Sequence, residues 1–498
     1  MSSAPSSAES VAGPPAAAPA VPAVPGPPGG SRTSLVLGIL VMSAFVMILN
    51  ETILSVALRD LARDLGVATT TVQWLTSGFL LTMAVVIPTT GYLLVRFRPR
   101  QIFAAAMTLF TLGTLLGALA PGFEVLMAAR VLQAAGTAVM IPLLMTTVMR
   151  LVPVERRGAT MGTITIVIAV APAVGPTIGG AVLSTLDWRW MFWLVLPLAA
   201  VALVLGTSLL RLPTDTRRVP LDLLSMLLSA VGFSGVLYGL STIGESGQSG
   251  PVLAWTSIAV GIVALAVFAW RQIRLQRADR ALLDLRPFGY RDFTVALTVS
   301  ALVFMCFLGA SAILLPLYLQ TVLGASPFVS GLALLPGGLV LGLLGRPVGA
   351  LYDRVGARRL VIPGAAAIAA ALWLFAALGA GSPLALVVGI HMLLMAGLGL
   401  MITPLMTDSL GALPSRLYSH GSAILSTLQQ VAGAFGTAVF VTIATHGSLD
   451  PAGLPDAAGL RLAFAAAGCV GVLSLVGSLF VRGIRAREPS GSPARDAA

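Results

Sequence analysis

Fourteen long apolar stretches constrain the fold of this chain more than any other feature of its sequence. Each is about 20 residues or longer, enough for an α-helix to cross the hydrocarbon core of a bilayer. Of the 498 residues, 57% are hydrophobic and 10% are charged, whereas soluble domains carry roughly 25% charged residues. The sequence therefore predicts an all-α, multi-pass protein of the plasma membrane. The stretches lie near 34–57, 72–94, 101–120, 125–149, 159–185, 189–210, 221–243, 252–271, 293–319, 328–351, 359–380, 383–407, 420–445 and 461–481.

The distribution of arginine indicates how these stretches are oriented. Basic residues concentrate in the cytoplasmic loops of membrane proteins, and here the connections after even-numbered stretches hold the Arg clusters, whereas those after odd-numbered stretches hold few Arg. Both termini are therefore predicted to be cytoplasmic. The clusters are Arg96, Arg98 and Arg100; Arg150, Arg156 and Arg157; Arg211, Arg217 and Arg218; the Arg residues between 271 and 291; Arg354, Arg358 and Arg359; Arg416; and Arg482, Arg485 and Arg487.

A repeated segment divides the chain into two halves. The sequence GYLLVRFRPRQ at 91–101 follows the second stretch, and GALYDRVGARR at 349–359 follows the tenth. Duplicated halves are common in transporters, and a 6 + 2 + 6 arrangement makes these two stretches equivalent. We expect a disordered cytoplasmic tail, an N-terminal six-helix bundle, a two-helix insert with cytoplasmic linkers, a C-terminal six-helix bundle and a second cytoplasmic tail, at 1–33, 34–210, 211–292, 293–481 and 482–498 respectively.

Two further segments match known transporter motifs. The fifth stretch reads APAVGPTIGG at 171–180, similar to the Gly-Pro-x-x-Gly-Gly signature associated with antiporters through Gly175, Pro176, Gly179 and Gly180. The fourth reads LMAARVLQAAGTA at 126–138, similar to an Arg-x-x-Gln-Gly motif. Over about residues 34–481 the chain resembles the major facilitator superfamily, specifically its 14-span drug:proton antiporters, which include multidrug, quaternary ammonium and lincomycin exporters.

The repeated segment corresponds to the cytoplasmic gate motif of that family, Gly-x-Leu-x-Asp-Arg-x-Gly-Arg-Arg. The N-terminal copy departs from the motif, because Val95 stands at the position of the Asp and Arg98 at that of the Gly. The resemblance implies that the family Asp forms a charge-relay gate with neighbouring helices, and the N-terminal half lacks that acid. The C-terminal copy matches at Gly349, Leu351, Asp353, Arg354, Gly356 and Arg358, and the N-terminal copy at Gly91, Leu93, Arg96 and Arg100.

An acidic residue interrupts the first stretch, which reads FVMILNETILSVAL at 45–58. Asn50 stands where the resemblance implies an Asp, and Glu51 follows. A carboxylate is expensive at membrane depth and marks a functional site. Counted from the outer ends of their stretches, Glu51 and Arg130 lie at similar depths, each about 8 to 9 Å along the axis.

We therefore hypothesise that Glu51 binds a proton from outside, releases it inside and competes with a bound drug, while Arg130 tunes the exchange. The alternative is a fixed ion pair that holds the first and fourth stretches together. For the Gly-Pro-x-x-Gly-Gly segment, the resemblance implies packing between the two halves that limits proton leak. The alternative there is a generic close helix crossing.

Four polar residues are candidates for lining a central substrate cavity, although such residues also join helices to one another: Gln133, Thr165, Gln429 and Gln430. Cys306 and Cys469 fall in apolar stretches and are interpreted as packing residues. His391 lies in the twelfth stretch without an evident acidic partner. Neither it nor His420 nor His446 forms a convincing metal site, so we expect no metal and no cofactor.

The leading functional hypothesis is proton-driven efflux of amphipathic drugs, cationic or zwitterionic, by alternating access. A narrow-specificity metabolite exporter or symporter of the same fold is the alternative. We find no nucleotide-binding loop, zinc motif or catalytic triad in the sequence, so we do not expect an enzyme. The expected partners are a small amphipathic substrate, protons and the lipid bilayer, without nucleic acid, and a monomer is favoured.

Overall fold

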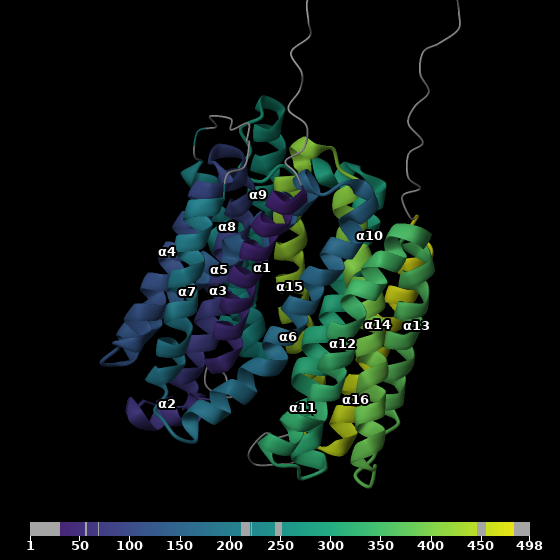
Figure 1. The fold of residues 1–498 in the computed structure, drawn as a ribbon. Helices are drawn as coiled ribbons and strands as arrows, with labels where there is room; N and C mark the ends of the chain where they lie inside the picture. The colour runs from purple at the N-terminus through teal and green to yellow at the C-terminus, as the bar shows by residue number, and fades with distance from the viewer. Residues whose placement is uncertain are drawn as a thin grey trace, which may run out of the picture.

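The computed structural model describes residues 30–54, 57–67, 69–210, 220, 222–244, 251–445 and 455–482, and all regular structure within them is helical (Figure 1). The predicted all-helical fold is confirmed. Within these residues, 13 helices are long and apolar enough to cross a membrane. The long helices are α1 (Gly30–Ile53), α3 (Thr69–Arg96), α4 (Pro99–Ala118), α5 (Phe123–Leu151), α6 (Arg157–Leu183), α7 (Arg189–Leu209), α8 (Leu223–Gly244), α9 (Pro251–Leu275), α10 (Arg291–Cys306), α12 (Pro327–Val355), α13 (Arg358–Ala376), α14 (Leu384–Gly411), α15 (Tyr418–Thr445) and α16 (Ala457–Leu479).

Shorter helical segments complete these elements. Helix α2 (Leu58–Asp64) follows α1, and α10 continues through a π-helical segment at Phe307–Leu314 into α11 (Leu315–Leu317) and a second π-helical turn. Helix α1 begins at Gly30, so the last residues of the predicted N-terminal tail are helical. The rest of that tail, the C-terminal tail from 483, the segment 211–219 and His446 lie outside the described residues.

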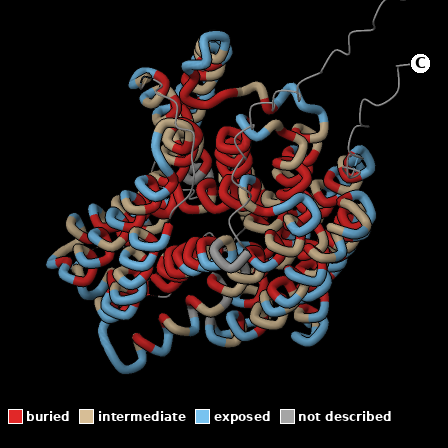
Figure 2. The backbone as a smooth tube through the Cα atoms, turned by 45° about the horizontal axis from the view of Figure 1, so that its top comes forward, coloured by how far each residue is buried: buried red, intermediate tan, exposed pale blue. Residues whose placement is uncertain are grey.

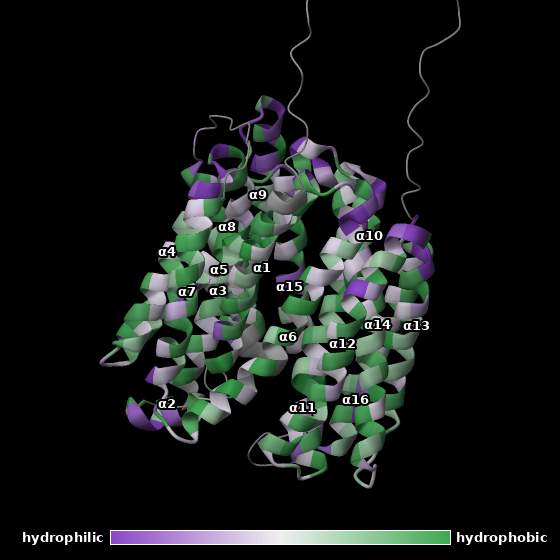
Figure 3. Ribbon diagram, in the orientation of Figure 1, coloured by the Kyte–Doolittle hydropathy of each residue, from purple (hydrophilic) through white to green (hydrophobic). Residues whose placement is uncertain are grey.

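Polar residues gather at one end of the bundle, the upper end in Figure 3. Helices α3, α5 and α12 end there, and α4, α6 and α13 begin there. We call it the Arg-rich end, because it carries the clusters Arg96, Arg98 and Arg100; Arg150, Arg156 and Arg157; and Arg354, Arg358 and Arg359. Each helix thus reverses the direction of its predecessor, as the alternation of arginine predicts.

The helix boundaries repeat along the chain. Helices α5 and α14 begin 261 positions apart (384 minus 123), and the same spacing separates the starts of α1 and α10 and of α6 and α15. Helices α3 and α12 begin 258 positions apart (327 minus 69), which is also the spacing of Gly91 and Gly349. The two halves are therefore structural copies of one another, as expected for a transporter built from repeats.

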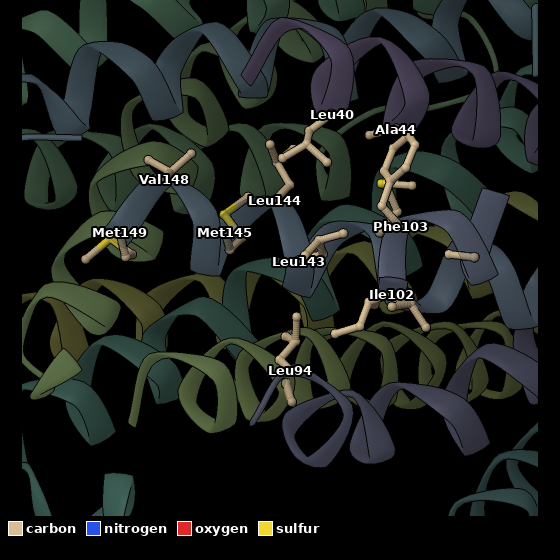
Figure 4. Close-up of a cluster of buried hydrophobic side chains, with 14 of the residues drawn as sticks. Leu40, Ala44, Leu94, Ile102, Phe103, Leu143, Leu144, Met145, Val148 and Met149 are labelled. Atoms are coloured by element: carbon tan, nitrogen blue, oxygen red, sulfur yellow. The ribbon is translucent and has the colours of Figure 1, made fainter. Parts of the chain in front are cut away.

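One buried apolar cluster lies mainly in the N-terminal half and continues into the ends of α10, α14 and α15 at the Arg-rich end, and a second lies in the C-terminal half. Figure 4 shows part of the N-terminal one, where Leu40 of α1, Phe103 of α4 and Leu143 of α5 pack together. Lipid is as apolar as these side chains, so close packing rather than the hydrophobic effect holds such helices together. Figure 2 accordingly shows buried residues concentrated on the inner sides of the helices and exposed residues on the outer sides.

The two halves meet mainly where α6 lies along α12, with further contacts of α15 against α3 and α5 (Figure 1). Glycines permit the close approach of α6 and α12: a Cβ added to Gly345 would lie 2.5 Å from the carbonyl oxygen of Gly162, and Gly349 opposes Gly158 in the same way. At the opposite end of the bundle, α2 and α11 lie far apart in Figure 1.

Helices α8 and α9 pack against each other, and α8 also packs against α3 and α15. At the Arg-rich end Asp222, just before α8, accepts two hydrogen bonds from Arg271 of α9, at 2.8 Å from Nε and 3.0 Å from Nη2. Burial raises the pKa of the Asp222 carboxyl, but the hydrogen bonds from Arg271 and Ser225 outweigh burial and hold that pKa at about 2. The carboxylate is therefore charged at any physiological pH.

Asp222→Asn is expected to lower the midpoint of thermal unfolding in detergent by about 2 °C, because one partly buried ion pair is lost. The folded pKa lies below the unfolded value of about 3.9, so the stabilisation is complete above that pH and is lost as pH falls toward 2. The difference from wild type should be constant between pH 8 and 5. Asp60→Asn is the control, since the Asp60 to Arg63 pair is exposed; a difference that disappears near pH 6 would contradict the account.

Candidate functional site

Arg130, on α5, is the centre of a buried polar network. It is 1% exposed. Its Nη1 donates hydrogen bonds to Asn50 Oδ1 at 3.3 Å and to Gln133 Oε1 at 3.2 Å. Its Nε donates to the carbonyl oxygen of Leu75 at 3.2 Å. The guanidinium carbon lies 4.1 Å from the centroid of the Phe79 ring, a cation–π arrangement that offsets part of the cost of desolvation.

The network continues from Gln133, whose Nε2 donates to Thr114 Oγ1 at 3.0 Å. Helices α1, α3, α4 and α5 thus all contribute to holding one cation inside the N-terminal half. The Nη2 atom of Arg130 is buried and donates to no acceptor among the described residues. A buried charged donor without a partner is costly, so this atom marks a point where binding of an acceptor would be favourable.

Glu51 follows Asn50 on α1 and is half-buried. It lies within electrostatic range of Arg130, but no ion pair within 4 Å joins these two described residues. The fixed ion pair considered as an alternative is therefore not what the structure contains, because Arg130 is held by Asn50 instead. The Glu51 carboxylate remains outside the hydrogen-bond network, next to its cation.

Asn50 is the member of this network that sequence reasoning missed. The signal was present, since Asn50 occupies the position of the acid in the motif that this stretch resembles. A neutral amide there can accept a hydrogen bond from Arg130 without neutralising it. The positive charge of Arg130 is therefore left to interact with Glu51, one position further along the helix.

The glycine motif of α6 lies against the same part of α1. A Cβ on Gly175 would collide with the Thr52 side chain and lie 3.2 Å from the backbone nitrogen of Ile53, and Thr52 Oγ1 is 3.4 Å from the carbonyl oxygen of Ala171. Gly175 therefore contacts α1 within its own half, whereas α6 meets α12 from Gly158 as far as Val170. Packing of the rest of the motif between the halves stays a prediction. Gly179 is buried and Gly180 has open space around it; the side chain of Pro176 lies outside the described part.

The C-terminal gate motif joins the two halves at the Arg-rich end. The carboxylate of Asp353, near the end of α12, accepts hydrogen bonds from the backbone N–H groups of Gly158 at 2.8 Å and Ala159 at 2.9 Å. These residues lie in the first turn of α6, so the carboxylate caps the N-terminus of a helix in the other half, where the helix dipole favours an anion. Gly356 ends α12 with a positive φ of 79°, which explains the glycine in the motif. Arg354 and Arg358 are exposed.

The N-terminal copy of the motif uses different chemistry. Gly91 packs against His420 of α15, where an added Cβ would lie 2.7 Å from Nδ1. That Nδ1 accepts a hydrogen bond from the backbone N–H of Asp284 at 3.2 Å. The connection after α9 therefore packs next to Gly91, four residues before Val95. Arg96 is half-buried, with its guanidinium 5.6 Å from the Phe97 ring centroid, and Arg100 is exposed.

Asp353→Asn is expected to weaken closure of the Arg-rich end. The amide keeps one acceptor oxygen but loses the charge and one of the two hydrogen bonds, a loss of about 1.5 to 3 kcal/mol. A shift of about tenfold or more toward the open state follows, seen as faster labelling of a cysteine introduced at Gly342. Arg354→Gln, an exposed neighbour, should label at the wild-type rate. Equal labelling of Asp353→Asn and wild type would contradict this role.

The predicted cavity residues mostly join helices. Gln133 belongs to the Arg130 network, Thr165 Oγ1 lies 2.9 Å from Thr403 Oγ1 across the two halves, and Gln429 Nε2 donates to Ser300 Oγ at 3.0 Å. Gln430 is half-buried. A pocket of about 450 Å³ lies between α3, α8 and α9 and is lined by none of these four residues.

Arg346 is a second intramembrane cation that sequence reasoning passed over. It interrupts the apolar sequence of α12, and its side chain is exposed. Its Cα faces α6, 3.1 Å from where a Cβ on Gly162 would stand. A charge exposed to lipid is costly, so this position at the contact between the halves favours an orientation toward water.

Comparison with known proteins agrees with this architecture. The sequence profile described as Major Facilitator Superfamily matches residues 40–437. The chain is 39% identical over 460 residues to the lincomycin resistance protein LmrB of Bacillus subtilis (strain 168), covering 90% of this chain and 95% of that protein. It is 32% identical over 417 residues to a multidrug resistance protein B homolog of Mycobacterium tuberculosis (strain ATCC 25618 / H37Rv), covering 82% and 76%.

Solved structures share the fold at low sequence identity. The human organic anion transporter MFSD10 has a TM-score of 0.65 at 15% identity, covering 90% of this chain and 99% of that one. The proton:xylose symporter XylE has a TM-score of 0.65 at 16% identity, covering 92% and 97%. The chain is a multi-pass membrane transporter rather than an enzyme, and it belongs to the Major Facilitator Superfamily.

Proposed function

We propose that this protein exports amphipathic drugs from the cell in exchange for protons, by alternating access. The proposal includes 14 membrane spans arranged 6 + 2 + 6, with the Arg-rich end in the cytoplasm. The first six spans are α1 and α3 to α7, the two-span insert is α8 and α9, and the last six spans lie within α10 to α16. The resistance proteins named above, which align with most of this chain, support drug efflux. Helix α6, 27 residues long, is the span that completes the count.

The observation that carries the proposal is the arrangement of Glu51 beside Arg130 without an ion pair between them. A protonated Glu51 removes a negative charge near Arg130, and an ionised Glu51 restores it. Binding of a drug that carries a positive charge favours the ionised form, so drug and proton compete for the same carboxylate. Such competition is what antiport requires, because each ligand must displace the other.

Alternating access would expose Glu51 first to one side of the membrane and then to the other. The hydrogen bonds of Asp353 to α6 and the glycine contact between α6 and α12 close the Arg-rich end, which corresponds to an outward-facing state. In this state Glu51 would load a proton from outside. Opening of the Arg-rich end would then expose the same carboxylate to the cytoplasm, where the proton leaves and a drug enters.

The glycine motif lets α6 pack closely against the part of α1 that carries Glu51. Gly175 lets α6 approach the backbone of α1 next to Thr52, one residue from Glu51. A larger side chain at Gly175 would separate the two helices and admit water to the carboxylate in the wrong state. We therefore expect Gly175→Val to leak protons without drug, which distinguishes a coupling role from generic packing.

The test uses purified protein in liposomes with the Arg-rich end facing the medium and an acidic lumen. Cationic dyes, lincosamides and quaternary ammonium compounds are added outside in turn, and their concentration in the lumen is measured with and without the pH gradient. Accumulation above equilibrium that needs the gradient supports antiport. Gradient-driven movement in the opposite direction would indicate a symporter, and equilibration without any dependence on the gradient would contradict proton coupling.

A further inference from the structure

A second buried polar pair lies in the C-terminal half. His391 of α14 is 2% exposed, and its Nε2 lies 3.1 Å from the Oγ of Ser311 in the π-helical segment after α10. The two residues are 80 positions apart in the sequence, as are Asn50 and Arg130. His391 is the eighth residue of α14, and Arg130 is the eighth residue of α5. The internal repeat thus brings one buried pair to the same depth in each half.

The surroundings of the two pairs also correspond. Phe79 of α3 lies under the guanidinium of Arg130. The matching residue of α12, at the spacing of 258, is Gly337, where an added Cβ would press on Nδ1 of His391. The glycines six residues after Arg130 and His391 both allow close contact with a neighbouring helix: Gly136 against the carbonyl oxygen of Ala106, and Gly397 against that of Gly364. The C-terminal pair is therefore a copy of the Arg130 site with altered chemistry.

Two differences mark the C-terminal copy. Leu394 and Leu372, both fully buried, replace Gln133 and Thr114, so no further polar chain leads away from His391. In addition, Nδ1 of His391 is buried and has no hydrogen-bond partner among the described residues. Because Gly337 has no side chain, the imidazole of His391 fits against α12. Its unpaired nitrogen, Nδ1, lies inside the bundle.

From this geometry we infer that His391 is a second proton-binding group of the transport cycle, an inference that rests on the proposed antiport. In the neutral tautomer with hydrogen on Nε2, that N–H donates to Ser311 Oγ and leaves the lone pair of Nδ1 as the base. Binding forms one N–H bond at Nδ1 and produces an imidazolium, and release returns the same proton to water. No other bond forms or breaks.

Among the described residues, the neighbourhood of His391 contains no fixed charge to compensate the imidazolium. Helices α6, α10, α12, α13 and α15 pack against α14. Arg346 of α12 is nine residues from Gly337, about 14 Å along the helix. In the described residues, the other charged groups of these helices lie toward the Arg-rich end, as do Asp408 of α14, His420, Tyr352 and Tyr418: Arg157, Arg291, Asp292, Asp353, Arg354, Arg358 and Arg359. Cys306 of α10, five residues before Ser311, adds a thiol rather than a fixed charge.

An uncompensated cation in this core is unfavourable unless the bundle opens to water, so protonation of His391 is tied to conformation. The π-helical segment that carries Ser311 offers a means of movement. Single π-turns within α-helices are frequent at functional sites, and a change of helical register there would move Ser311 away from His391. Proton release from His391 would then follow the same opening and closing that exposes Glu51. The transport cycle would carry two protons, one in each half.

The first test is a titration that does not depend on transport. The chain has only three His residues, so 15N-histidine labelling gives few signals, and His391→Gln assigns the one that disappears. We expect the His391 signal to titrate, and its midpoint to change in Ser311→Ala, where the imidazole keeps its place but loses its partner. A His391 signal that stays constant down to the lowest pH at which the protein remains folded would overturn the inference even if the protein is an antiporter.

The second test counts protons per substrate in liposomes. His391→Gln should lower the ratio by one proton while substrate exchange continues, whereas Leu394→Met, a buried neighbour without a titratable group, should keep the wild-type ratio. An unchanged ratio in His391→Gln would overturn the inference. Absence of any proton coupling in wild type would instead refute the proposed antiport, so the two failures are distinguishable.

Discussion

Replacing Arg130 by Lys is expected to lower proton-driven transport at least tenfold while the protein still reaches the membrane. The guanidinium holds Asn50, Gln133 and Leu75 from two different nitrogens at once and stacks on Phe79. An ammonium group has the same charge but cannot reproduce this planar fork. Loss of one such charged hydrogen bond costs about 1.5 to 3 kcal/mol, or roughly tenfold or more.

The matched control is Arg63→Lys, because Arg63 on α2 is exposed and its pair with Asp60 is weak. Transport should be measured together with the amount of folded protein recovered after size-exclusion chromatography. Wild-type transport in Arg130→Lys would show that only the charge of Arg130 matters and that the network is dispensable.

Gly349→Leu is expected to abolish transport by preventing closure of the Arg-rich end. Gly349 and Gly158 touch through their backbones, so a side chain at 349 would meet the carbonyl oxygen of Gly158 rather than a flexible side chain. The only relief is separation of α6 from α12, which also pulls Asp353 away from the N–H groups of Gly158 and Ala159. The variant should be held open at this end.

Gly331→Leu on the same helix provides the control, since nothing lies within 4 Å of its Cβ position. Crosslinking between cysteines placed at Thr165 and Thr403, whose hydroxyls are 2.9 Å apart, reports closure. The cysteines should crosslink in wild type and Gly331→Leu but not in Gly349→Leu. Efficient crosslinking in Gly349→Leu would contradict the requirement for a backbone contact.

The helical fold and its repeat could be predicted from the sequence because both depend on local, periodic signals. Apolar length determines a membrane helix, and the spacing of Gly91 and Gly349 already equals the offset between α3 and α12. The depth of Arg130 relative to Glu51 followed from counting residues along two helices. What the sequence could not supply was which side chain Arg130 would bind.

The choice of Asn50 over Glu51 depends on rotation about the axes of α1 and α5, which residue counting does not determine. The same limit applies to Gly175. Gly175 packs closely against α1 rather than against the other half, and this choice of partner depends on which face of α6 turns inward. His391 was noted without a partner because Ser311 is 80 residues away, and only the folded repeat brings the two together.

The role of the Asp in the gate motif shows a further limit. The departure at Val95 indicated that one copy lacks its acid, but not that His420 and the backbone of Asp284, from two other parts of the chain, would form a hydrogen bond beside Gly91 of that copy. Neither residue belongs to the motif. Their contact is visible only when the connection after α9 is placed over α15.

The most direct test of Glu51 as the proton-coupling acid is drug-dependent movement of protons in liposomes containing Glu51→Gln. Gln has nearly the shape of a protonated Glu but cannot release a proton, so we expect that drug addition no longer changes the pH of the lumen, while exchange of labelled for unlabelled drug continues. Glu124→Gln, exposed at the start of α5, should behave like wild type. Proton movement that persists in Glu51→Gln would place the coupling acid elsewhere and contradict the account.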